Sequence, residues 1–314
     1  MTTQTDVQAV IDFAAKHLGT EKVVIEHDGV KVPGLILPSG RTFQSLVSAI
    51  DGQREHPVRK EGSATLRTLD SFIAHVNRFK NPHSAIFAAP DAQSPRLTAV
   101  LDYHEAQDGK PRFGAHRSVL DLELSEAWKA WTGKNGQQMD VSSFAEFLES
   151  RVEDVVDSDG LDAKGPTMLL AEKLSVSFAK PAMMMAVARG LHVKATTNVS
   201  DVVNLETGEV NLKFEVNHEP AGGLRAPAAF VIGIQVFRGG QPYYVAVRLR
   251  YRLANGKVYW TFHLYRTDKV FDLAFEESCT KAQTETKLPL MFGADEDDDT
   301  DGSAPDDDDD DENE

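Results

Sequence analysis

The feature that most restricts the fold lies in the second half of the chain, where hydrophobic and polar residues alternate along runs separated by two-residue turn signals. The runs are residues 230–237, 243–253 and 257–265, with Gly239-Gly240 and Asn255-Gly256 between them. Such glycine-containing pairs favour tight β-hairpin turns, and the length of a turn determines which residues lie opposite each other. The pattern therefore predicts an antiparallel meander whose register can be counted from its turns.

Counting outward from Asn255-Gly256 places Ala254 opposite Lys257 and separates two faces. One face is apolar and is predicted to be buried, with the pairs Tyr251–Trp260, Leu249–Phe262 and Val247–Leu264. The other face carries the pairs Arg252–Tyr259, Arg250–Thr261, Arg248–His263 and Ala246–Tyr265. The Gly239-Gly240 turn adds Ile232 and Ile234 to the apolar face, and Gln235 and Tyr244 to the other.

The polar face of the meander is the candidate binding site. Its residues are Tyr244, Arg248, Arg250, Arg252, Tyr259, His263 and Tyr265. Guanidinium groups neutralise phosphates, and aromatic rings stack on bases, so this mixture suits single-stranded nucleic acid. Two other interpretations stay open. Arginine and tyrosine also stabilise an ordinary solvent-facing sheet by cross-strand pairing, and helices from the first half of the chain could cover the face.

The first half of the chain mixes helical and extended patterns. Helices are expected over residues 7–18, 68–80 and 142–156, the last with Ser142 or Ser143 as N-cap and Glu146 as its acidic partner. Strands are expected over residues 23–25, 30–37, 84–88, 97–104 and 117–124. Beyond residue 166 the pattern predicts helices near 167–174 and 183–189, a strand over 210–216 and a final helix over 269–287. The predicted fold class is α+β, with helices packed on one face of the C-terminal meander.

Four regions are expected along the chain. An N-terminal α+β region spans residues 1–156, and the polar sequence DSDGLDAKGP connects it, over 157–166, to a β-rich region at 167–290. Residues 291–314 are expected to form a disordered acidic tail, because Asp with Gly, Ser and Pro cannot build a core.

Net charge is distributed very unevenly. The formal net charge is −16, yet residues 295–314 contain 14 acidic and no basic side chains, which leaves 35 acidic against 33 basic in the rest. The body of the protein is therefore close to neutral, and overall acidity does not exclude a polyanionic ligand. Three roles of the acidic run stay open: competition with nucleic acid for the basic face, binding of a basic partner, or solubility alone.

Catalytic and metal-binding patterns are not convincing. Asp102 and His104 share a strand face, but no third ligand can be assigned. The sequence from Asp157 resembles a calcium loop, yet its twelfth position is Met168, which offers no oxygen ligand. Cys279 is the single cysteine, so no intramolecular disulfide can form, and it is expected to be a packed thiol. No enzyme, cofactor or metal is predicted.

The expected cellular location rests on two patterns that the sequence lacks. No run of 18 apolar residues suggests a membrane span, and the N-terminus has no secretory signal pattern. With one cysteine, these features favour a reducing cytoplasm and no membrane partner.

Three stretches, taken in order, have a distinctive pattern: PVRKEGSATLRTLDSFIAHVNRFKNPHSAIFA from Pro57, SFAEFLESRVEDV from Ser143, and FVIGIQVFRGGQPYYVAVRLRYRL from Phe230. In this order and spacing they resemble the YfdQ-like family of phage and prophage proteins, a domain of unknown function. The resemblance covers about residues 10 to 285 and implies a phage or prophage origin in a bacterial host. It implies no catalytic residues, and the acidic run is not part of the family pattern.

The leading hypothesis is a non-enzymatic phage accessory protein that binds single-stranded nucleic acid in phage DNA metabolism or protection, with the acidic tail as an electrostatic competitor. The alternative is a self-assembling or host-factor-binding protein whose acidic tail engages basic partners. Homo-oligomer formation is compatible with either.

Overall fold

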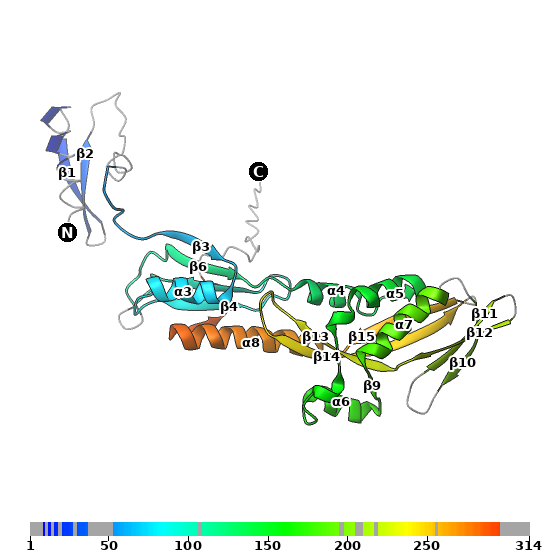
Figure 1. Ribbon diagram of the computed structural model, residues 1–314. Coiled ribbons are helices and arrows are strands. Elements are labelled where there is room, and N and C mark those ends of the chain that lie inside the picture. Colours follow the sequence, from blue (N-terminus) through cyan, green and yellow to red (C-terminus); the bar gives the residue numbers. More distant parts are fainter. Residues whose placement is uncertain are drawn as a thin grey trace, which may run out of the picture. The chain divides into compact units, whose positions relative to one another are not determined.

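The computed structural model describes residues 9, 12, 13, 16, 17, 21–27, 30–36, 53–105, 109–194, 198–204, 210–216, 219–254 and 257–295 (Figure 1). The chain forms two compact units, residues 1–60 and 61–314.

The first unit contains a two-stranded antiparallel ladder. Strand β1 (Glu21–His27) pairs with β2 (Val30–Ile36), with His27 opposite Val30. This confirms the extended pieces predicted over residues 23–25 and 30–37, while residues 28 and 29 between the two strands lie outside the described residues. Residues 9, 12, 13, 16 and 17 are helical, and the other positions of the helix predicted over 7–18 lie outside the described residues.

A five-stranded mixed sheet opens the second unit. Its order is β16 (Leu290–Phe292), β4 (Ala85–Ala89), β5 (Arg96–Val100), β6 (His116–Asp121) and β3 (Gly62–Leu66). The two edge strands, β16 and β3, run parallel to their neighbours, and the inner pairs are antiparallel.

Two helices pack together beside this sheet, α3 (Leu69–Phe79) and α8 (Thr267–Thr286). Helix α3 begins where Thr68 caps it, since the Thr68 hydroxyl accepts a hydrogen bond from the Ser71 amide at 3.2 Å. Phe72, Ile73 and Val76 recur at helical spacing, and all three are buried. The helix stops just before Asn81-Pro82, as the sequence predicts.

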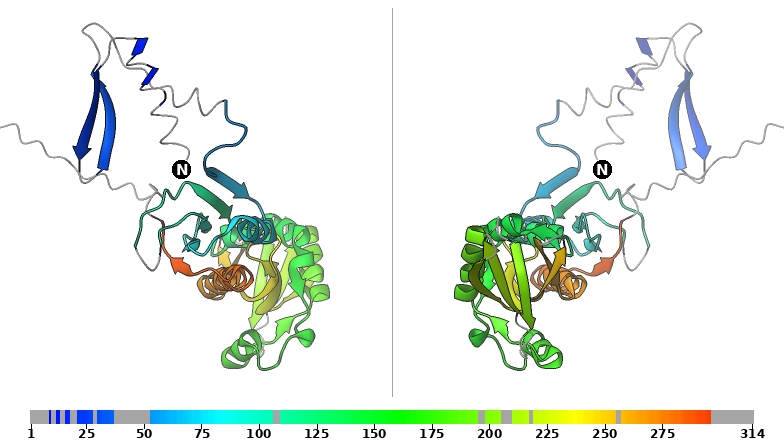
Figure 2. Two further views of the ribbon diagram at one scale, coloured as in Figure 1. Left: turned by 90° about the vertical axis from the view of Figure 1, so that its left-hand side faces the viewer. Right: turned by 90° about the vertical axis from the view of Figure 1, so that its right-hand side faces the viewer.

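A six-stranded sheet forms the rest of the core. Its order is β7 (Met139–Asp140), β15 (Lys257–Leu264), β14 (Pro242–Ala254), β13 (Ala229–Gln235) and β8 (Val155–Val156), and β9 (Phe178–Ala179) runs parallel to β13. Helices α4 (Glu126–Lys134), α5 (Val141–Ser150) and α7 (Pro181–Lys194) lie on one side of this sheet and α6 (Pro166–Leu174) on the other (Figures 1 and 2). The predicted α+β class, with a C-terminal antiparallel meander, is confirmed.

Three further strands form a separate antiparallel sheet. They are β10 (Asn198–Asn204), β11 (Val210–Val216) and β12 (Glu219–Ala226), paired in that order. The strand predicted over residues 210–216 is therefore confirmed as β11.

The start of α5 differs from the sequence prediction. Asp140, rather than Ser142 or Ser143, is the N-cap, and its carboxylate accepts a hydrogen bond from the Ser143 amide at 2.8 Å. The Ser142 hydroxyl instead donates to Glu146 at 3.3 Å. The helix also ends at Ser150, because the following residues form the short 3-10 helix η1 (Val152–Asp154) and then strand β8. Because a carboxylate caps a helix as well as a hydroxyl does, Asp140 serves as the N-cap and α5 begins earlier in the chain than predicted.

Segments on both sides of residues 157–166 contribute strands to the same sheet. Strands β7 and β8 precede that segment, yet both belong to the six-stranded sheet. Strand β16 follows the last helix and joins the five-stranded sheet. The two compact units of the chain meet after Lys60. Short strands contribute few local signals, so their long-range pairing was not visible in the sequence.

The C-terminal region also differs from its expected boundary. Met291 and Phe292 lie in strand β16, and Asp295 is buried, although both positions fall within the segment expected to be disordered from residue 291. The remainder of that segment, residues 296–314, lies outside the described residues.

Candidate nucleic-acid interface

The register counted from the Asn255-Gly256 signal agrees with the structure at every described pair. Arg248 lies opposite His263, Arg250 opposite Thr261 and Arg252 opposite Tyr259. Ala254 faces Lys257, and the two turn residues themselves lie outside the described part of the chain. A connection of two residues determines which residues of the two strands lie opposite each other. The register of this hairpin could therefore be predicted from the turn signal.

The second hairpin explains the position of Tyr244. Gly239 adopts a φ of +77° in the turn, and β13 and β14 pair so that Gly233 faces Tyr244 and Gln235 faces Pro242. A two-residue turn at Gly239-Gly240 would instead have placed Gln235 opposite Tyr244, so the predicted register of this hairpin is wrong by two residues. Because the shift is even, the predicted faces are unchanged. A Cβ atom built on Gly233 would lie 2.9 Å from Cγ1 of Val156 and 3.3 Å from Cε1 of Tyr244. Only glycine therefore lets the Tyr244 ring lie across the neighbouring strand.

Aromatic packing determines which face of the meander is buried. The Trp260 ring stacks on Phe144 of α5, with ring centroids 5.1 Å apart and planes inclined by 11°. Phe262 contacts both Trp131 of α4 and Phe147 of α5, at centroid distances of 5.2 and 5.5 Å. These contacts cover the apolar face with α4 and α5, which leaves the arginines on the other face.

We call this other side the outer face, defined by the seven predicted site residues Tyr244, Arg248, Arg250, Arg252, Tyr259, His263 and Tyr265. The three arginines are exposed, as are Tyr244 and Tyr265, whose exposed fractions are 51% and 49%. Tyr259 and His263 are half-buried. Within the described residues, none of the three arginines forms an ion pair with a carboxylate. The alternative that helices cover the arginine row is therefore not what the structure shows.

Helix α6 covers the outer face only at one end. Val231 and Ala246 lie opposite each other on this face and are buried, and α6 packs against β14 in the same region. Thr167 at the start of α6 donates a hydrogen bond to the carbonyl oxygen of Tyr244 at 3.4 Å. The arginine row therefore begins where the contact with α6 ends.

Two charged groups at the other end of the outer face were not assigned to the site from sequence. Lys257 continues the arginine row and is exposed, and the register counted from the turn already placed it there. Asp140 lies opposite Tyr259 on the neighbouring strand β7. The Ser143 backbone amide, then the Ser143 hydroxyl, lower the pKa of Asp140 and keep it ionised. This carboxylate marks the acidic border of an otherwise cationic surface.

The loop after α4 closes the edge beside His263. The Gly136 amide donates to the Phe262 carbonyl at 2.9 Å, and the side chain of Asn135 accepts from the Leu264 amide at the same distance. A Cβ on Gly136, whose φ is +73°, would lie 3.9 Å from the His263 ring. This contact explains why His263 is only half-exposed.

Comparison with known proteins gives a family and no activity. The sequence matches the profile of the uncharacterized conserved proteins called DUF2303 over residues 3–294. This chain belongs to the DUF2303 family. No curated protein and no solved structure matches it. The expectation of a domain of unknown function extending over most of the chain is thereby confirmed in its coarser form.

In this DUF2303 chain, the side chains considered as a possible metal site form hydrogen bonds within the fold. The Asp102 carboxylate accepts hydrogen bonds from the amides of Ala115 and His116, at 3.2 and 2.9 Å. Nδ1 of His104 accepts from the Arg112 amide at 3.0 Å. Both side chains thus hold the loop between β5 and β6. Among the described residues, no group of three or more metal-ligating side chains is found.

The acidic loop of the DUF2303 chain at Asp157 is likewise held by its own neighbours. Asp157 caps the 3-10 helix η2 (Ser158–Gly160), and Lys180 forms ion pairs with Asp157 and Asp159. Cys279 is buried in α8, as predicted. Within the described ranges, no helix is long and apolar enough to span a bilayer.

Proposed function

We propose that this DUF2303 protein is a phage or prophage accessory protein of the bacterial cytoplasm that binds single-stranded nucleic acid on the outer face and does not act as an enzyme. The observation that carries the proposal is the row Arg248, Arg250 and Arg252, exposed and unpaired among the described residues. The phage origin rests on the sequence resemblance to the YfdQ-like family.

The spacing of the row suits an extended polyanion. Alternate residues of an antiparallel strand lie roughly 7 Å apart, so three guanidinium groups form a straight line of cationic sites. Tyr259 and His263 stand opposite two of them on the next strand. A backbone held along β14 would place bases over these rings, where stacking contributes about 1–3 kcal/mol per base.

The acidic run would compete with nucleic acid for the arginine row of the same chain. Thirteen acidic side chains between residues 296 and 314 carry charge of the same sign as phosphates. A segment of this kind on the same chain is present at high effective concentration and would compete for the arginine row. Full-length protein is therefore expected to bind weakly and with a preference for low salt.

The decisive experiment measures fluorescence anisotropy of a labelled poly-dT oligonucleotide against salt concentration. Protein ending after Asp295 should bind more tightly than the full chain. Arg248→Ala with Arg250→Ala should lower affinity at least tenfold at low salt and reduce the salt slope by roughly 1.4, because each phosphate contact on a single strand contributes about 0.7.

A matched control removes two cations elsewhere. Lys129 of α4 and Arg189 of α7 are exposed on the helices of the opposite side, so Lys129→Ala with Arg189→Ala changes net charge equally. This variant should bind like the parent. Absence of binding by both the full chain and the shortened chain at low salt would rule the function out.

A second candidate function rests on the acidic run itself: self-assembly, or binding of a basic host or phage protein through that run. It predicts that the oligomeric state, measured by light scattering, changes when residues 296–314 are removed, while the arginine substitutions have no effect. An unchanged oligomeric state, together with oligonucleotide binding, would favour the first function.

A further inference from the structure

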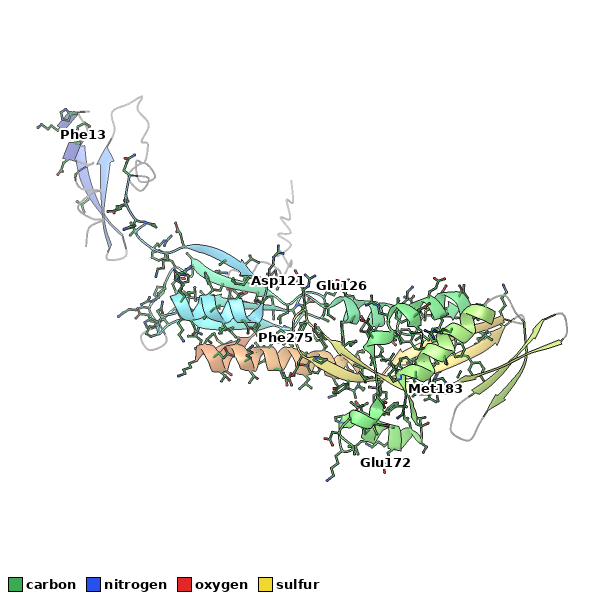
Figure 3. The ribbon with its side chains drawn as sticks, viewed as in Figure 1. Phe13, Asp121, Glu126, Glu172, Met183 and Phe275 are labelled. Atoms are coloured by element: carbon green, nitrogen blue, oxygen red, sulfur yellow. The ribbon has the colours of Figure 1, made fainter. Side chains whose placement is uncertain are left out.

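A cleft with a volume of about 470 Å³ lies within the second unit, away from the outer face. Four segments line it: residues 67–70 at the start of α3, residues 120–123 at the end of β6, residues 237–241 and 243 of the β13–β14 hairpin, and one side of α8 around Glu277. In Figure 3 the labels Asp121 and Phe275 mark the β6 and α8 sides of this region. Its size falls in the range of small-molecule sites, which are roughly 300–1,000 Å³.

The base of the cleft is apolar. Leu120, Leu122 and Ala274 are buried there, and Phe237 packs edge-on against Phe271 with centroids 5.5 Å apart. These residues belong to the close-packed core. The base of the cleft therefore keeps its shape when exposed side chains at the rim change conformation.

Most charges at the rim neutralise one another. Lys281 lies 2.6 Å from Asp70, and Arg238 lies 2.9 Å from Glu123. Asp121 pairs with Arg96 at 2.7 Å. Three of the carboxylates that line the cleft therefore already have cationic partners.

Glu277 is the exception among these carboxylates. Its Oε2 atom accepts hydrogen bonds from the Tyr243 hydroxyl and the Gln241 amide, and both donors are uncharged. Burial, and then the bond to Glu277, raise the pKa of Tyr243 to about 12, so the phenol stays protonated as a donor. Among the described residues Glu277 has no ion pair. Two donors thus orient a carboxylate whose charge is uncompensated and whose Oε1 atom neither of them engages.

Arg67 supplies an uncompensated charge of opposite sign. It lines the cleft and forms no ion pair within the described residues. Helices α3 and α8 lie side by side, joined by Asp70–Lys281 near one end and by the bond from Lys80 to the Thr286 carbonyl at the other. Arg67 precedes Asp70 by three residues and Glu277 precedes Lys281 by four, so both lie toward the same end of the cleft.

We propose that this cleft binds a small zwitterion of the amino-acid class, with its ammonium group on Glu277 and its carboxylate on Arg67. A ligand carrying only a cation would be repelled by Arg67, and a ligand carrying only an anion would be repelled by Glu277. A molecule with both groups matches both uncompensated charges. This inference is independent of nucleic-acid binding, since none of the outer-face residues lines the cleft.

The test uses isothermal titration calorimetry with the full chain and a series of ω-amino acids from glycine to 8-aminooctanoate. Increasing chain length separates the two charged groups of the probe and so measures the separation that the cleft accepts. One length should bind best, at least tenfold more tightly than 1,5-diaminopentane or pentanoate, each of which lacks one of the two charges.

Variants identify the residues. Glu277→Gln and Arg67→Gln should each weaken the best probe at least tenfold, while Glu276→Gln, an exposed α8 carboxylate that does not line the cleft, should leave binding unchanged. Thermal melting of every variant checks that the fold is retained. Absence of heat from all probes at about 10 mM, or equal affinity in Glu277→Gln, would overturn the proposal.

Discussion

Arg117 and Asp295 form an ion pair that joins the beginning of the acidic run to the five-stranded sheet, with Nη1 of Arg117 2.9 Å from Oδ2 of Asp295. The two side chains are only 16% and 2% exposed. The first carboxylate of the run is therefore part of the fold, whereas the sequence predicted a disordered tail from residue 291 onward.

Asp295→Asn should destabilise the protein by about 1.5–3 kcal/mol, because it removes the charge from an interaction with Arg117 that is largely shielded from solvent. The free energy of unfolding in urea measures this effect. Replacing both partners, Arg117→Met with Asp295→Ala, should cost less than the sum of the two single changes. Additive costs would show that the ions do not interact.

Two buried tryptophans offer a matched comparison. Trp131 and Trp260 are both fully buried, but Nε1 of Trp131 donates to Asp154 at 2.8 Å whereas Nε1 of Trp260 has no hydrogen-bond partner within the described residues. Trp131→Phe should therefore cost more than Trp260→Phe by roughly 1–3 kcal/mol, since only the first change breaks a bond to a carboxylate. Equal costs in chemical denaturation would contradict this account.

Tyr243 should ionise at about pH 12 in the folded protein, against a normal value of 10.0. Its raised pKa contributes stability below pH 10. That contribution declines between about pH 10 and 12, because the unfolded chain releases the phenolic proton first. Ultraviolet absorbance of the parent minus that of Tyr243→Phe isolates this titration. Glu277→Gln should lower the pKa, though not fully to 10.0, since burial is the larger cause.

Cys279 should resist thiol reagents in the native state. Its side chain is buried, and burial, followed by the charge of Glu276, raises the pKa of the thiol to about 12. Because it is the single cysteine of the chain, the rate of its reaction with Ellman's reagent at neutral pH reports opening of α8. Reaction as fast as that of an unfolded control would show that the helix does not protect it.

Much of the candidate interface could be predicted because it depends on local information. The turn signal beside Ala254 and Lys257 determines every pair between β14 and β15, and alternation then assigns Arg248, Arg250 and Arg252 to one face. The apolar character of Trp260 and Phe262 identifies the buried side without knowledge of its partners.

The cleft could not be predicted, because its walls come from four segments far apart in sequence. Glu277 and Arg67 are separated by more than half of the chain, and neither belongs to a recognisable motif. Only the packing of α8 beside α3 brings them to one end of a shared cavity.

The amino-acid sequence by itself determined the register of the β14–β15 hairpin, the two faces of the meander and the position of the main helices, since each depends on residues within a few positions of one another. Tertiary structure decided that β7, β8 and β9 join the meander, that β16 joins the other sheet, and that the arginine row stays uncovered. These outcomes depend on long-range contacts, in which short segments compete for the same sheet edges, and their energies are not encoded in any local pattern.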